Sequence, residues 1–143
     1  MNLDLAHIGN TPLDITEFDA VADSEHGFEF ELKDKDGITG TGVFVTVQGK
    51  HADEVSKWMN ALVNKMTREA QMAQRKGKQV DPKSLEEMRD QNIDGAALRV
   101  TGWRNVKQPF ARDLLKVAMK RNPHWVDQVI EESDNLGNFT KAV

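Results

Sequence analysis

The sequence contains no cysteine among its 143 residues. This absence excludes a disulfide framework, a zinc site built on cysteine, and a cysteine nucleophile. It is consistent with a reducing compartment, where disulfides are rare. The hydrophobic content of 38% is modest but sufficient for a single core.

Long apolar runs are also missing. The N-terminus, "MNLDLAHIGNTPLDITEF", has neither the basic start nor the apolar stretch of a secretory signal. No apolar run approaches the roughly 18 residues that a membrane helix needs. We therefore expect an intracellular, soluble protein without a membrane partner, folded as a single domain over residues 1–143.

Residue combinations typical of catalytic or metal sites are scarce. The histidines are His7, His26, His51 and His124. No two of them have the spacing of ligands on one helix face. "DKDG" (34–37) begins like a calcium loop but has Val45 where the twelfth position requires glutamate. "GITGTG" (37–42) lacks the Gly-Lys-Ser/Thr of a phosphate loop. The sequence thus predicts a protein that is not an enzyme and has no cofactor or metal.

Charge is distributed unevenly along the chain. Residues 1–40 contain ten acidic residues and two lysines, a net charge of −8, so the remaining residues carry +4. Residues 65–78 hold five basic residues and one glutamate. The acidic front and the basic rear can pair within the fold or between subunits, or they can be two solvated surfaces. Because no aromatic residue lies among the basic ones and the whole chain is acidic, we expect no nucleic-acid binding.

Alternation of apolar and polar residues predicts two strands. "FEFELK" (28–33) places its phenylalanines and leucine on one face and its charged residues on the other. "TGTGVFVTVQGK" (39–50) places its valines on one face, with a bulge or close packing expected near Gly40 and Gly42. "DKDG" supplies a turn. The two strands therefore form a hairpin whose apolar face needs cover from helices.

Helical spacing dominates the rest of the chain. The expected helices cover residues 50–78, 82–103, 109–121 and 122–136. The second begins with Asp81 as its cap and Pro82 in its first turn. The start of the chain is polar, with at most a short strand near residues 15–21. The predicted class is α+β, with an N-terminal antiparallel hairpin or small sheet (residues 1–50) packed against a bundle of three to four helices (residues 51–143).

The longest predicted helix carries an apolar stripe that contains methionines. Met59 and Met66 are expected in the core, whereas Met72 suits the core and a partner surface equally well. A 26-residue helix spans about 39 Å, but a six-residue strand spans only about 20 Å. Part of the stripe is therefore solvated, self-paired or bound by a partner. We predict a partner-binding surface at Met66, Met72, Leu136 and Phe139.

Two aromatic residues lie at the break between the second and third predicted helices. Trp103 ends one helix and Phe110 begins the next. Large rings fill the space between two helix axes at such a junction, and truncating a buried ring costs about 3–5 kcal/mol. Both rings are therefore predicted to anchor this corner.

The last third of the chain has a recognisable order of motifs. "LRVTGWRNV" is followed by "PFARDLLK", then "NPHWVDQVIEES", then "NLGNF". This order, together with the upstream "TGTGVFVTVQGKHADEV", resembles the tail assembly chaperones of long-tailed (siphovirus-type) bacteriophages over roughly residues 38–139. The positions that match are mostly packing residues: Trp103, Asn105, Val106, Pro109, Phe110, Leu114, Leu115, Trp125, Val129, Ile130, Asn138 and Phe139.

The resemblance implies a transient, non-catalytic function in virus assembly. Such chaperones coat the helical tape measure protein and help to recruit tail tube proteins. The implied partners are these two proteins and further copies of the chain, and the implied location is the host cytoplasm and not the mature virion. The alternatives are a structural virion protein of the tail or head–tail connector and a small DNA-binding regulator.

Overall fold

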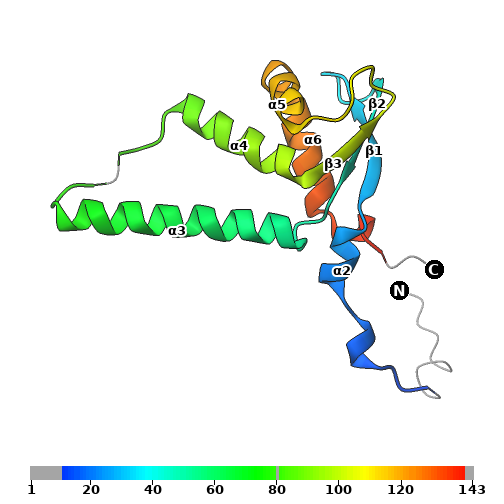
Figure 1. Cartoon of the computed structure of the whole chain (residues 1–143), viewed down its shortest axis with the longest axis horizontal. Coiled ribbons are helices and arrows are strands. Elements are labelled where there is room, and N and C mark those ends of the chain that lie inside the picture. Colours follow the sequence, from blue (N-terminus) through cyan, green and yellow to red (C-terminus); the bar gives the residue numbers. More distant parts are fainter. Residues whose placement is uncertain (1–10, 80, 141–143) are drawn as a thin grey trace.

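The computed structural model describes residues 11–79 and 81–140, and it has an α+β fold. The strands are β1 (Phe28–Lys33), β2 (Gly40–Val47) and β3 (Val100–Arg104), and they form an antiparallel sheet in the order β1-β2-β3. The α-helices are α2 (Ala20–Glu25), α3 (Asp53–Arg75), α4 (Leu85–Arg99), α5 (Arg112–Arg121) and α6 (Pro123–Asp134), and the 3₁₀ helices are η1 (Ile15–Glu17) and η2 (Leu136–Asn138). Helices α4, α5 and α6 gather beside the sheet, while α3 extends away from it (Figure 1).

The hairpin of β1 and β2 confirms the alternation in the sequence. Phe28 pairs with Val47 and Phe30 pairs with Val45, so that these four side chains share the face that the helices cover. The register shifts between Glu31 and Lys33, opposite the start of β2. This irregularity is the bulge expected from the glycines at that end of the strand.

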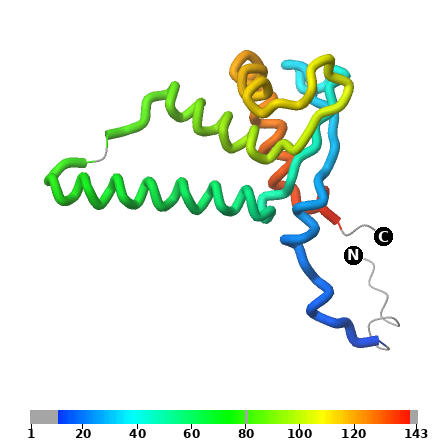
Figure 2. The backbone as a smooth tube through the Cα atoms, viewed as in Figure 1, coloured from blue at the N-terminus to red at the C-terminus, as the bar shows by residue number. Residues whose placement is uncertain are grey.

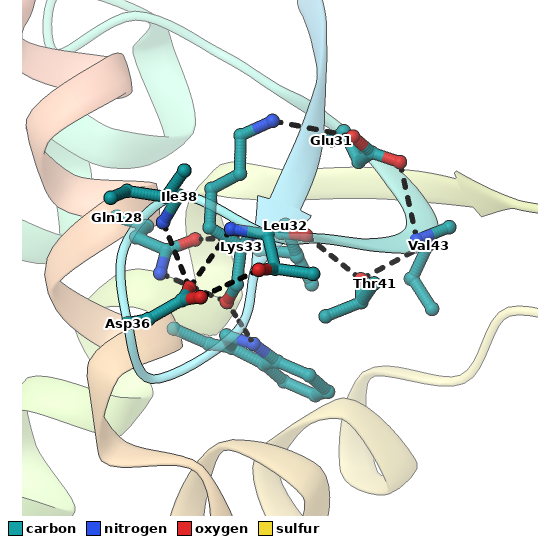
Figure 3. A network of polar contacts seen from close by, with 11 residues as sticks. Glu31, Leu32, Lys33, Asp36, Ile38, Thr41, Val43 and Gln128 are labelled. Atoms are coloured by element: carbon teal, nitrogen blue, oxygen red, sulfur yellow. Dashed lines mark hydrogen bonds and ion pairs between the residues drawn. The ribbon is translucent and has the colours of Figure 1, made fainter.

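The turn between β1 and β2 is held by one carboxylate. Asp36 accepts hydrogen bonds from the backbone N–H groups of Ile38 and Thr39, both at 2.9 Å, and from the Thr39 hydroxyl (Figure 3). Gly37 has a φ of +73°, a left-handed backbone conformation that is strained for residues with a side chain. The turn is therefore fixed locally by the "DKDG" sequence, as predicted.

The end of β1 is tied to α6 through the backbone of Lys33. Its N–H donates to Gln128 Oε1 at 2.8 Å, and its carbonyl accepts from Gln128 Nε2 at 3.1 Å and Trp125 Nε1 at 3.0 Å (Figure 3). Trp125 thus packs its ring against the core and satisfies its own donor at the sheet. These bonds orient α6 across β1.

A third strand replaces the predicted end of the second helix. Val100 and Trp103 are three residues apart, a spacing that suggests a helix face, but they lie on β3 opposite Val47 and Val45. The register shifts beside Val47, so Thr101 is an extra residue on β3. This bulge places Val100 and Trp103 on the same face of the sheet. The expected helix over residues 82–103 is therefore wrong at its C-terminal end.

Three helix starts also differ from expectation. Helix α4 begins at Leu85, because the Ser84 hydroxyl accepts from the Glu87 N–H at 3.1 Å; this cap replaces Asp81 and Pro82. Helix α5 begins at Arg112 and not at Pro109. The short strand expected near residues 15–21 is instead η1 and the start of α2, whose first turns are capped by the carboxylates of Asp14 and Asp19.

The core lies between the sheet and helices α4, α5 and α6. Its buried members come from all of these elements and from Phe139 after η2: Leu32, Val45, Val47, Ile93, Ala96, Ala97, Val100, Leu115, Met119, Val126, Val129 and Phe139. On the opposite, solvated face of the sheet, Arg104 pairs with Glu29 at 2.8 Å and lies over the Phe44 ring at 4.2 Å. The hydrogen bond from Arg104 lowers the pKa of the Glu29 carboxyl.

Candidate partner-binding surface

Helix α3 packs on the rest of the protein near its beginning. Val55 is buried, and the Trp58 ring lies against Gly95 of α4, where an added Cβ would come within 2.8 Å of the ring. Beyond this contact α3 continues away from the sheet, with α4 returning along it (Figures 1 and 2). We call residues 59–75 of α3 and residues 85–92 of α4 the helical arm.

The helical arm exposes large apolar side chains. They are Met59, Val63 and Met66 in the middle of α3, Met72 near its end, and Leu85 and Met88 at the start of α4. The first three follow one another at helical spacing, so they form one stripe. An exposed stripe of this kind on a helix that projects from the body is typical of an interaction surface.

Met72, for which the core and a partner surface were equally expected, is exposed, and the predicted burial of Met59 and Met66 is wrong. Met66 is 52% exposed and Met72 is 55% exposed. The stripe was expected to meet the hairpin, yet the sheet is covered by α4, α5 and α6. Helix α3 therefore has too little of the body beside it to bury more than its first turns.

Basic residues flank the apolar stripe at the outer end of α3. They are Lys65, Arg68, Arg75, Lys76 and Lys78, and the only acidic residue between positions 65 and 78 is Glu69. Lys65 and Glu69 approach to 4.0 Å, an exposed pair that contributes little to stability. The outer end of α3 therefore combines apolar side chains with a net charge of +4, which favours an acidic, partly apolar partner.

The two C-terminal candidates lie in different environments. Leu136 is 42% exposed on η2, whereas Phe139 is 5% exposed and packs edge-on against Phe28, with ring centroids 6.3 Å apart. Phe139 is thus a core residue, and its predicted place on a partner-binding surface is wrong. Leu136 belongs to η2, and the red C-terminal segment of Figure 1 lies away from the outer end of α3. The predicted four-residue surface is therefore reduced to Met66 and Met72.

The aromatic residues that were predicted to pack at the corner before α5 do so. The rings of Trp103 and Phe110 meet edge to face with centroids 5.1 Å apart, and Trp103 Nε1 donates to the Gln108 carbonyl at 2.8 Å. Both rings and the Trp125 ring pack against the core. They hold the connection between β3 and α5, so their role in this structure is to shape the corner.

A buried polar cluster lies at the base of the arm, and the sequence gives little indication of it. The Arg99 side chain, at the end of α4, donates to Ser133 Oγ at 3.2 Å and to Asp134 Oδ1 at 2.8 Å. Ser133 Oγ donates to the Gln48 carbonyl at 2.7 Å. The only available clue was that Ser133 follows Val129 by four residues on the apolar face of α6. The cluster joins α4, α6 and the end of β2, and its function here is structural.

The surface of the described residues has hollows beside α4, α5 and α6. One, of about 540 Å³, is lined by Ile93, Met119 and Val126 and by charged residues of both signs. A second, of about 240 Å³, lies between Trp103, Trp125 and the side of α5. Within residues 11–79 and 81–140, no group of three or more histidine, aspartate or glutamate side chains is placed to hold a metal ion. His7 lies outside these residues.

Comparison with known proteins gives no family. No family model, no curated protein and no solved structure matches this chain. In the part of the chain that the structure describes, no helix is both long and apolar enough to span a bilayer. The features that bear on function are therefore the helical arm and the order of motifs in the sequence.

Proposed function

We propose that this protein is a tail assembly chaperone that binds the tape measure protein without catalysis. The observation that carries the proposal is the helical arm, which presents Val63, Met66 and Met72 to solvent on a helix that the body does not cover. The order of motifs around Trp103, Phe110 and Trp125, which resembles that family, supports the proposal. The recruitment of tail tube protein belongs to the same proposal.

The chemistry of the arm suits a long helical client. An amphipathic helix recognises a partner by laying its apolar face along an apolar stripe. Methionine side chains are flexible and polarisable, so they adapt to the changing side chains of an elongated client. A stripe that is already exposed on a preformed helix has little ordering entropy to lose on binding.

A capture experiment tests the proposal. The tape measure protein is co-expressed with tagged wild type, with Met66→Asp plus Met72→Asp, and with the matched control Ile38→Asp plus Val117→Asp. All four positions are exposed, and the control pair lies in the hairpin turn and on α5. Wild type and control are expected to capture the client, whereas the arm variant is expected to lose it. Far-ultraviolet circular dichroism verifies that each variant is folded.

Two results would contradict the proposal. Equal capture by the arm variant would exclude the arm as the client surface, and no capture by wild type would exclude the chaperone function. Purified virions separate the proposal from its structural alternative, since a tail or connector subunit is present there in many copies and a chaperone is not. Salt-sensitive binding to duplex DNA would favour the regulator instead.

A further inference from the structure

A second exposed apolar region precedes the sheet. Residues 11–26, here called the acidic segment, contain η1 and α2 and extend away from the body on a different side from α3 (Figures 1 and 2). The segment carries five acidic residues and no lysine or arginine. Its exposed large side chains are Leu13, Ile15, Phe18 and Val21; Ile15 is 83% exposed and Phe18 is 70% exposed.

The acidic segment is shaped in advance and anchored at one end. The Ser24 carbonyl accepts from the Gly49 N–H at 2.8 Å, and Glu25 Oε1 accepts from the Asp53 N–H at 3.3 Å. Carboxylate caps stabilise η1 and α2, so Ile15 and Val21 are held in short helical turns, with Leu13 and Phe18 beside them. Exposing four large apolar side chains to water on a structured segment is unfavourable, which indicates that another surface covers them.

The outer end of α3 has the chemistry that complements this segment. The acidic segment has a charge of −5, and residues 65–78 have a charge of +4. Each region combines its charge with exposed apolar side chains, so one contact would remove both apolar surfaces from water and bring opposite charges together. Residues 99–112 also have a charge of +4, but Arg99 and Arg104 already pair with Asp134 and Glu29.

We propose that the acidic segment of one copy of this protein packs on the outer end of α3 of a second copy. In a two-fold dimer each copy supplies one segment and one α3, so the contact occurs twice. The double contact brings the buried area toward the roughly 1,200–2,000 Å² of a stable interface. The contact is made between copies of this chain alone and does not rest on the proposed tail function.

The chain's own α3 is the competing occupant. The segment joins the body at the beginning of α3, and Arg68 and Arg75 lie about 22 and 33 Å along that helix. To reach them within one copy, the segment would have to reverse its direction at α2, whose position is fixed by Ser24 and Glu25. A second copy can bring its α3 to the segment without this change.

Charge variants test the proposal with purified full-length protein. The segment variant is Glu17→Lys plus Asp23→Lys, and the arm variant is Arg68→Glu plus Arg75→Glu. Wild type is expected to be oligomeric by sedimentation, and each variant alone is expected to associate at least about tenfold more weakly, the change that 1.4 kcal/mol produces. An equimolar mixture is expected to associate more tightly than either variant, because only mixed oligomers contain an unaltered segment on an unaltered arm. A monomeric wild type, or a mixture no tighter than its components, would overturn the proposal.

Engineered cysteines locate the contact, since the chain has none of its own. Phe18→Cys and Met72→Cys, carried on chains of different size, are mixed and oxidised. A disulfide between the two chains is expected, and Ile38→Cys mixed with Met72→Cys is the control that does not form one. In the double variant Phe18→Cys plus Met72→Cys, a disulfide within one chain in place of the linked dimer would show that the segment folds onto its own α3, and it would overturn the proposal. Because no client is present, failure here leaves the proposed function untouched.

Discussion

The body and the helical arm use the same kinds of residue in opposite ways. In the body, Met119 on α5 has no exposed surface, and the strands and three helices pack their apolar faces on one another. On the arm, Met72 on α3 is 55% exposed and contributes to no core. An apolar helical stripe thus indicates that a surface will be covered, but it does not indicate whether the covering partner belongs to the same chain.

The comparison extends to polar groups. Where the arm joins the body, Arg99 donates to Ser133, and Ser133 donates to the Gln48 carbonyl, in a buried cluster. Along the arm, the polar contacts are exposed ion pairs such as Lys65 with Glu69. Buried hydrogen bonds are costly to break, whereas exposed ion pairs contribute about 0–1 kcal/mol. The stability of the protein therefore resides in the body, and the arm is free to change partners.

The largest expected effect comes from matched methionine truncations. Met119→Ala removes a fully buried side chain and is expected to lower the free energy of unfolding by about 2–5 kcal/mol. Met72→Ala removes an exposed one and is expected to change it by less than about 0.5 kcal/mol. Urea denaturation of dilute protein, followed by circular dichroism, measures both. Similar costs for the two variants would refute the division into body and arm.

A smaller effect is expected at the joint between the regions. Ser133→Ala leaves the Gln48 carbonyl without its donor and removes an acceptor from buried Arg99. An unsatisfied buried group costs about 1–3 kcal/mol, and the unfolding free energy should fall by that amount. Ser56→Ala on α3 is the control, with an expected change within about 0.5 kcal/mol. If the two serine variants were equally stable, the cluster would not hold the joint.

The contact of α3 with α4 can be changed by one methyl group. Gly95→Ala places a Cβ against the Trp58 ring, and overpacking costs about 1–3 kcal/mol. The gain of about 1 kcal/mol in helix propensity offsets part of this, leaving a net loss of roughly 1 kcal/mol. In a protein that already carries Trp58→Leu, Gly95→Ala should instead raise the free energy of unfolding. A double-mutant cycle in urea measures the coupling, and its absence would show that the ring does not set the approach of the helices.

The smallest expected effect is a pH dependence in the hairpin turn of the body. Hydrogen bonds from the Thr39 hydroxyl and then from the backbone N–H groups of Ile38 and Thr39 lower the pKa of Asp36 to about 2 from its usual 3.8. Since the folded-state pKa lies below the unfolded one, the stabilisation is complete above about pH 4 and is lost as the pH falls toward 2. Asp36→Asn, which does not titrate, should differ from wild type in melting temperature at pH 6, and the difference should shrink between pH 4 and 2. A difference in melting temperature that stays constant between pH 4 and 2 would contradict the lowered pKa of Asp36.

Much of the body could be predicted because its signals are local. The alternation in residues 28–33 and the glycines at the start of β2 specified the hairpin, and Pro123 marked the start of α6. The strand β3 was missed because its bulge gives Val100 and Trp103 the spacing of a helix. The Arg99 cluster was missed because an arginine in a last helical turn normally lies in solvent.

The sequence by itself determined the α+β class, the hairpin and its turn, the position of α6, and the apolar stripe with its basic flank on α3. These features depend on residues close together in the chain, whose periodicity and turn chemistry act before any distant contact forms. Only the tertiary structure decided which apolar faces are covered. It buried Phe139 against Phe28, left Met66 exposed, and recruited Val100–Arg104 into the sheet. The physical reason is that burial is shared among all elements, and once α4, α5 and α6 had covered the apolar face of the sheet, that face was no longer open to the outer part of α3.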